Sequence, residues 1–173
     1  MLMKFIGGIA VCLSCSLIGL YLSFRINYRS NDLSELKKAL LMLKAEIEFS
    51  RNSLPVAFGV LSERTEGKLS EFFMLISVKM SEKSGEEASL IWKNAVSEKL
   101  SKTYLEPDDI KCAERLGNVI GHPDSLLQLE NIDMALAYID ETVSKLGSQN
   151  EKTSRMYKSV GVVSGVLITV VLI

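Results

Sequence analysis

The sequence predicts an all-α protein, a six-helix bundle whose first and last helices continue into the membrane. Two observations lead to this prediction. Apolar residues recur at spacings of three and four through the middle of the chain, and no stretch alternates clearly enough to form a strand. In addition, both ends of the chain are uncharged over lengths that approach or reach a membrane span.

The first predicted element is residues 5–24, FIGGIAVCLSCSLIGLYLSF, which contain no charged residue. A hydrocarbon layer of ~30 Å requires ~20 helical residues, so this segment is long enough to cross it. The small-residue triplet at 14–16 suggests the alternative of a cleaved signal peptide, but the apolar run continues to Phe24. We therefore predict an uncleaved N-terminal transmembrane helix over 5–24.

Residues 25–155 are predicted to form one helical domain, because their number suits a single domain of ordinary size. A long amphipathic helix is expected at each end of this domain. The apolar stripe of the first is Leu33, Leu36, Leu40, Leu43 and Ile47, and that of the last is Leu129, Ile132, Leu136, Ile139, Val143 and Leu146.

Shorter helices are predicted between these two from their start and stop residues. Ser53 and Pro55 begin a helix that runs to about Arg64, and Gly67 precedes the next apolar stripe. Acidic residues after a break, as at 84–87, favour the positive end of a helix dipole. Proline followed by aspartates repeats this signal at 107–109, and that helix is expected to stop at Gly121.

The last predicted element is a C-terminal transmembrane helix over 156–173, within which 159–173 contain no charge. The long stem of Lys158 can reach the headgroups, which brings the span to roughly 18 residues.

The basic residues predict the orientation of both spans, because lysine and arginine resist translocation. Only Lys4 precedes the first span and no basic residue follows the second, so the central domain is expected to be cytoplasmic. The three cysteines form no disulfide framework, which agrees with a reducing compartment. The inner flanks carry Arg25, Arg29, Lys37 and Lys38 on one side and Lys145, Lys152, Arg155 and Lys158 on the other.

No enzymatic chemistry is predicted for this chain, and neither a cofactor nor a metal is expected. There is no glycine-rich phosphate loop, no metal-ligand spacing, and a net charge of −1 does not suggest nucleic acid. A membrane-tethered hydrolase using Cys112 and His122 is the alternative. The turn-like GHPD context at 121–124 favours a structural role for the histidine.

Residues 103–144, which we term the acidic section, contain nine acidic residues and only two basic ones. We predict that this section faces a partner, with a merely solvated surface as the alternative. The first candidate residues are Glu106, Asp108, Asp109 and Glu114, because they cluster around the start of one helix.

Small residues form possible packing faces on the two predicted spans, where close backbone approach replaces the hydrophobic effect. These candidates are Gly8, Cys12, Cys15 and Gly19 in the first span and Gly161 and Gly165 in the second.

Several segments, in their order and spacing, carry a likeness to a known family. They are MLMKFIGG followed by FRINYRS, then LKKALLMLKAEIEFSRNSLPVAF, ASLIWKNAV, LGNVIGHPDSLLQLENI with Leu116, Gly117, Gly121, Asp124, Gln128 and Ile132, and the apolar tail. Together they resemble the stage III sporulation protein AB family of endospore formers.

This resemblance implies a helical domain similar to the cytoplasmic repeat of type II secretion and type IV pilus platform proteins. It implies a platform component of the channel between mother cell and forespore, in the outer forespore membrane with its domain in the mother-cell cytoplasm. The implied partners are the secretion-type ATPase of the same operon, the other stage III sporulation channel membrane proteins and the lipid bilayer. The chain has one such repeat instead of two, which separates it from the platform pattern. A simple membrane tether is a further alternative.

Overall fold

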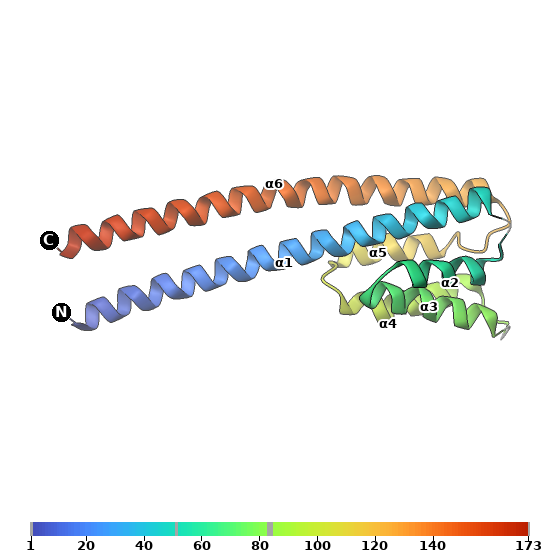
Figure 1. Cartoon of the computed structure of the whole chain (residues 1–173), viewed down its shortest axis with the longest axis horizontal. Coiled ribbons are helices and arrows are strands. Elements are labelled where there is room, and N and C mark those ends of the chain that lie inside the picture. The colour runs from blue at the N-terminus through green and yellow to red at the C-terminus, as the bar shows by residue number, and fades with distance from the viewer. Residues whose placement is uncertain (1, 51, 83–84, 173) are drawn as a thin grey trace. The chain divides into compact units, whose positions relative to one another are not determined.

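The computed structural model describes the backbone of residues 2–50, 52–82 and 85–172, and the side chains of Tyr21, 24–50, 52–82 and 85–149. Over these residues the chain is helical without a strand, which confirms the all-α prediction (Figure 1). The elements are α1 (Leu2–Phe49), α2 (Leu54–Arg64), α3 (Gly67–Ser81), α4 (Ala88–Lys99), the 3-10 helix η1 (Leu100–Lys102), α5 (Pro107–Gly117) and α6 (Ser125–Leu172).

The chain divides into two compact units, one made of Met1–Tyr28 with Ser144–Ile173 and the other of Arg29–Val143. The second unit, here called the central unit, falls inside the predicted domain 25–155. The predicted spans 5–24 and 156–173 belong to the first unit, and nearly all their side chains lie outside the described residues. Among the described residues, no helix combines the length and the apolar character needed to cross a membrane.

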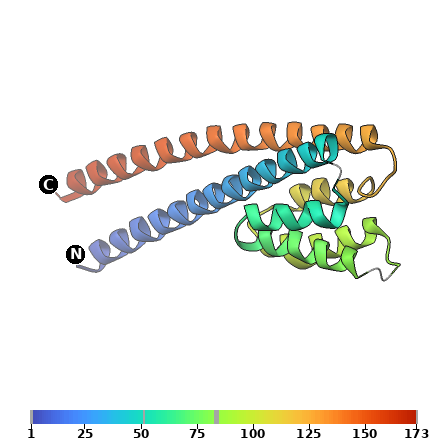
Figure 2. The ribbon, with the colours of Figure 1, turned by 45° about the vertical axis from the view of Figure 1, so that its right-hand side comes forward.

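Within the central unit, the inner part of α1 pairs with the beginning of α6 in antiparallel orientation (Figures 1 and 2). Lys37 contacts Asp140 at 2.5 Å, and further along α1 Lys44 contacts Asp133 at 2.6 Å. As residue numbers increase along α1, the residues contacted on α6 decrease in number, so the two helices run antiparallel. The buried residues of the predicted stripes within this unit are Leu33, Leu36, Leu40 and Leu43 on α1, and Ile132, Leu136 and Ile139 on α6.

Aromatic side chains join α2, α3 and α4 in a shared core. The rings of Phe58 and Phe73 stack with centroids 6.1 Å apart, and Phe72 meets Trp92 edge to face at 5.1 Å. All of these side chains are fully buried. Such aromatic pairs contribute about 0.5–1.5 kcal/mol beyond the area they bury, so this cluster is a main contributor to the stability of the central unit.

Helix α5 ends at Gly117, four positions before the predicted stop at Gly121. The indole of Trp92 donates a 2.7 Å hydrogen bond to the Ala113 carbonyl, which holds α5 against α4. After Gly117 the chain continues in tight turns, in which the amide of Val119 donates to the carbonyl of Leu116. Gly121 then adopts a φ of 83°, a conformation that favours glycine, and allows the reversal into α6.

Candidate partner-binding surface around helix α5

The N-terminus of α5 brings together the acidic residues that the sequence suggested. Pro107 occupies the first turn, and the Asp109 carboxylate accepts a 2.8 Å hydrogen bond from the Glu106 amide. Proline lacks the amide that would be unsatisfied there, and an acidic residue in the first turn favours the helix dipole. The local sequence therefore explains why the helix begins at this point.

Asp109 is also the centre of a network that joins three helices. Arg29 of α1 donates to its carboxylate from Nε at 2.8 Å and from Nη2 at 3.0 Å, and the Tyr138 hydroxyl of α6 donates at 2.8 Å. Arg29 also contacts Glu106 at 2.6 Å. The Asp109 side chain is 0% exposed and that of Arg29 is 13% exposed. This network holds the start of α5 between α1 and α6.

The pKa shifts follow from these contacts. Burial by itself raises the pKa of Asp109, but the hydrogen bonds from Arg29, the Glu106 amide and Tyr138 outweigh it and hold the pKa below its ordinary value. Burial and the hydrogen bond to Asp109 raise the pKa of Tyr138 to about 12. At neutral pH the network therefore consists of an ionised carboxylate, a cationic guanidinium and a neutral phenol.

The four predicted docking residues thus have different environments. Asp109 is buried and engaged by its own chain, so its carboxylate does not belong to the surface. Glu106 is partly exposed and paired with Arg29. Asp108 is exposed and contacts Lys111 at 3.2 Å. Glu114 is half-buried, and the described residues include no ion pair to it. These contacts leave Glu114 and the exposed Asp108 as the better candidates.

The wider acidic section carries less free charge than its composition suggests. Basic residues of α1, outside this section, neutralise several of its carboxylates: Lys37 pairs with Asp140 and Lys44 with Asp133. Asp124 accepts a 2.9 Å hydrogen bond from the Leu126 amide and caps α6. Counting charges along the sequence could not reveal these partners, because they come from a distant segment.

Cys112 and His122, the residues of the hydrolase alternative, have separate environments. Cys112 lines a pocket of about 380 Å³ between α5 and α6, and His122 is not among its lining residues. Burial raises the pKa of the Cys112 thiol, which opposes formation of a nucleophilic thiolate. The Nδ1 atom of His122 accepts a hydrogen bond from the Asp124 amide, as expected of a turn residue.

Two further site predictions concern metal binding and the packing of the two spans. Among the described residues, no group of three or more histidine, cysteine or acidic side chains is arranged to hold a metal ion. The predicted packing residues of the two spans lie outside the residues whose side chains are described, so that prediction stays a prediction. They are Gly8, Cys12, Cys15, Gly19, Gly161 and Gly165.

Sequence reasoning missed the roles of Arg29 and Tyr138. Arg29 was interpreted only as a basic flank of the first span, although it forms the ion pair of the network. A signal was present in the helical register: Arg29 stands one helical turn before Leu33, on the face of α1 that packs inward. A charge on such a face requires a partner of opposite sign.

Comparison of the whole chain with known proteins finds relatives. The family model "Stage III sporulation protein AB" matches residues 4–173. The chain belongs to the stage III sporulation protein AB family. Stage III sporulation protein AB of Bacillus subtilis (strain 168) is 20% identical over 171 residues, which cover 99% of each chain.

A solved structure of stage III sporulation protein AB has the same fold. It matches with a TM-score of 0.67 and 19% identity, and the match covers 72% of this chain and 97% of that chain. The family predicted from the spread-out segments is therefore confirmed, and membership implies a role in sporulation.

Proposed function

We propose that this chain is a non-enzymatic platform component of the channel between mother cell and forespore. In this role it sits in the outer forespore membrane, with its central unit in the mother-cell cytoplasm. It links the secretion-type ATPase of the same operon to the other stage III channel proteins. The observation that carries the proposal is membership of the family over nearly the whole chain, together with a helical unit that shares the family's fold.

Exposed aromatic side chains support the membrane part of this proposal. Tyr21, Phe24 and Tyr28 are 66%, 56% and 51% exposed and follow one another at spacings of three and four on α1. Tyrosine and other aromatic residues are favoured at the membrane–water interface, and the predicted first span ends at Phe24. Arg25 next to them suits the anionic headgroups of the cytoplasmic leaflet.

The central unit supports the adaptor part of the proposal. Its buried Asp109 is paired with Arg29 within the chain, and it presents Asp108 and Glu114 on one short helix. A stable helical unit with carboxylates near its surface suits protein docking, because charge complementarity sets partner choice and encounter rate. The hydrolase alternative gains no support from the separate surroundings of Cys112 and His122.

Direct binding tests this proposal. The full chain in lipid nanodiscs is expected to bind the purified ATPase with a Kd of about 10 µM or tighter, measured by biolayer interferometry against empty nanodiscs. A chain in which residues 29–143 are replaced by an unrelated helical bundle is the matched control. Equal binding by this chimera, or no binding by the natural chain, would contradict the adaptor role. The tether alternative predicts that the chimera still supports spore formation.

A further inference from the structure

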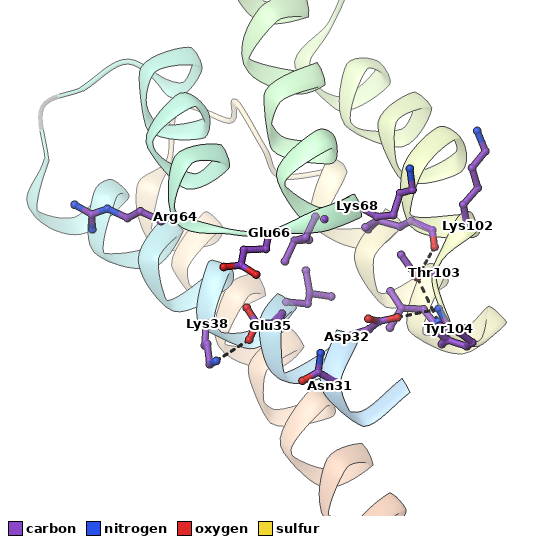
Figure 3. A pocket seen from close by; sticks show the side chains of 15 residues that line it. Asn31, Asp32, Glu35, Lys38, Arg64, Glu66, Lys68, Lys102, Thr103 and Tyr104 are labelled. Atoms are coloured by element: carbon purple, nitrogen blue, oxygen red, sulfur yellow. Dashed lines mark hydrogen bonds and ion pairs between the residues drawn. The ribbon is translucent and has the colours of Figure 1, made fainter. Parts of the chain in front are cut away.

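A pocket of about 720 Å³ lies in the central unit between α1, the turn joining α2 to α3, and the loop after η1 (Figure 3). Its lining holds four basic side chains and three carboxylates. Lys38 pairs with Glu35 at 2.7 Å, and the Tyr104 amide donates a 2.9 Å hydrogen bond to Asp32. Because both signs of charge are present and partly satisfied within the chain, this pocket favours no single kind of occupant.

The end of the helix pair where α1 stops and α6 starts has a different character (Figures 1 and 2). Phe49, the last residue of α1, is 80% exposed, and Leu126, in the first turn of α6, is 62% exposed. Lys44 pairs with Asp133 across the two antiparallel helices. Five residues further along α1, Phe49 therefore stands level with Gln128, within one turn of Leu126. Two large apolar side chains are thus exposed on neighbouring helix ends.

The charged residues at this end are nearly all acidic. Residues 45–53 and 121–131 contain four acidic residues and one basic residue, Arg51, which lies outside the described residues. Asp124 caps α6, whereas Glu48 and Glu130 are exposed, and the described residues include no ion pair to either of them. We use the name end patch for Glu48, Phe49, Leu126 and Glu130 together.

The charge of the end patch excludes several occupants. The backbone outside the described residues consists of 1, 51, 83–84 and 173, so the chain has no missing segment long enough to dock there. The anionic cytoplasmic leaflet would repel the two carboxylates, which disfavours a lipid surface. A second copy presenting the same patch would place like charges opposite one another, and such pairs are unfavourable at an interface.

A protein segment that carries a cation beside a large apolar side chain complements both halves of the patch. Aromatic residues and arginine are enriched in the cores of protein interfaces, and charge complementarity sets the choice of partner. We propose that the end patch docks a partner segment in which a lysine or arginine stands beside a large apolar side chain. The inference goes beyond the proposed function, because it assigns a second docking surface, separate from Asp108 and Glu114, and defines its occupant by chemistry alone.

Photocrosslinking of the full chain in sporulating cells tests this inference. Phe49→p-benzoylphenylalanine keeps the phenyl ring and adds a benzoyl group that reacts with its neighbours under light. We expect a covalent adduct with a protein partner, whose crosslinked peptide, identified by mass spectrometry, contains lysine or arginine beside an apolar residue. Met74→p-benzoylphenylalanine is the matched control, because Met74 is 51% exposed on α3. It should give at least fivefold less of this adduct.

Charge reversal tests the acidic half of the patch in the same cells. Glu48→Lys combined with Glu130→Lys should lower the yield of the Phe49 adduct about fivefold or more, because the partner's cation then meets like charge. Glu63→Lys combined with Glu82→Lys, at exposed acidic residues outside the patch, is the matched control and should leave the yield unchanged. Immunoblotting checks that all variants accumulate to the same level.

Truncation tests the apolar half. Leu126→Ser should lower the adduct yield about threefold, because it removes one of the two exposed apolar side chains from the contact. Val78→Ser on α3, where the side chain is 46% exposed, is the matched control and should have no effect.

The outcomes separate the inference from the proposed function. A Phe49 adduct no stronger than the Met74 adduct overturns the inference, and so does an adduct with lipid or with a second copy of this chain. A crosslinked peptide without lysine or arginine, or a yield unaffected by charge reversal, also overturns it. Capture of a basic apolar segment from a protein other than the ATPase supports the inference, and nanodisc binding then decides the proposed function separately.

Discussion

The ring of Trp92 occupies the space where a side chain at position 117 would stand. A β-carbon added to Gly117 would lie 2.6 Å from Cδ1 of Trp92, a distance that real β-carbons do not show. The ring is itself fixed by its hydrogen bond to Ala113 and by its contacts with Phe58 and Phe72. It therefore cannot move away cheaply, and glycine permits the close approach of α5 to α4.

Gly117→Ala is expected to lower the free energy of unfolding by about 1–3 kcal/mol, the usual cost of overpacking a filled core. The higher helix propensity of alanine offsets this by at most ~1 kcal/mol. Gly147→Ala on α6 is the matched control, because nothing lies within 4 Å of its added β-carbon. Urea unfolding of the detergent-solubilised chain, followed by circular dichroism, measures both. Equal stability of the two variants would show that Trp92 does not constrain position 117.

Asp109→Asn is expected to destabilise the protein by roughly 3 kcal/mol at pH 7, because it leaves the Arg29 guanidinium without its buried partner. Glu106 still contacts Arg29, which places the cost toward the low end of the range for such pairs. Asp108→Asn, on an exposed side chain, should cost less than ~1 kcal/mol. The free energy of unfolding in urea provides the comparison.

The same contact predicts a pH dependence. The folded-state pKa of Asp109 lies below its ordinary value of ~3.9, so its stabilising contribution is complete above that value. The contribution is lost as the pH falls through the lowered folded pKa. The difference in stability between the natural chain and Asp109→Asn should therefore be constant from pH 7 to 5 and shrink below pH ~4. A difference that stays constant down to pH 2 would argue against an ionised Asp109 in the network.

At the scale of elements, the inner part of α1 organises the central unit. One face carries the leucines that pack against α6, and the same helix supplies Arg29 to α5 and Asp32 to the loop after η1. Its lysines pair with α6 at the surface. A buried leucine contributes more to the free energy of unfolding than an exposed ion pair does.

Leu40→Ala is expected to destabilise the protein by about 2–5 kcal/mol, because the leucine is fully buried and the substitution leaves a cavity. Lys44→Ala, which removes the exposed pair with Asp133, should cost less than ~1 kcal/mol. The two positions are one helical turn apart, so they test the same helix pair. A larger loss from Lys44→Ala, measured by urea unfolding, would mean that ion pairs hold α1 to α6.

At the scale of the whole molecule, docking on α5 is tested by charge reversal. Glu114→Lys combined with Asp108→Lys should weaken ATPase binding roughly threefold to tenfold at low salt, and less at ~0.15 M salt, where charges are screened. Asp109 is left intact because reversing a buried, paired carboxylate would unfold the unit. Glu63→Lys on α2 is the matched control. The double variant must unfold at the same temperature as the natural chain. If its affinity for the ATPase equals that of the natural chain at every salt concentration, the partner binds elsewhere.

The membrane arrangement gives a second whole-molecule prediction. A cysteine replacing Asn150, in a chain without native thiols, should resist an impermeant maleimide in intact protoplasts and react after lysis, because the basic inner flanks are retained in the cytoplasm. A cysteine replacing Leu2 should react in intact cells. Labelling at position 150 before lysis would reverse the predicted orientation.

Local sequence was sufficient to predict most of the helices. The stripe from Leu33 to Leu43, the start of α2 after Ser53 and the start of α5 at Pro107 were all predicted. These features depend on neighbours three or four positions apart, on caps and on proline, so a short window contains their cause. The end of α5 was placed too late because the turn after Gly117 depends on packing.

The sequence by itself determined the helical class, the family and the acidic composition of residues 103–144. Only the tertiary structure decided which of those acids face solvent. Asp109 meets Arg29 across 80 positions and Tyr138 across 29, whereas Asp32 receives no cation from the described chain. The physical reason is that a charge is paired or left unpaired by what lies beside it in space. Only the packing of α1 against α5 and α6 brings those distant residues together.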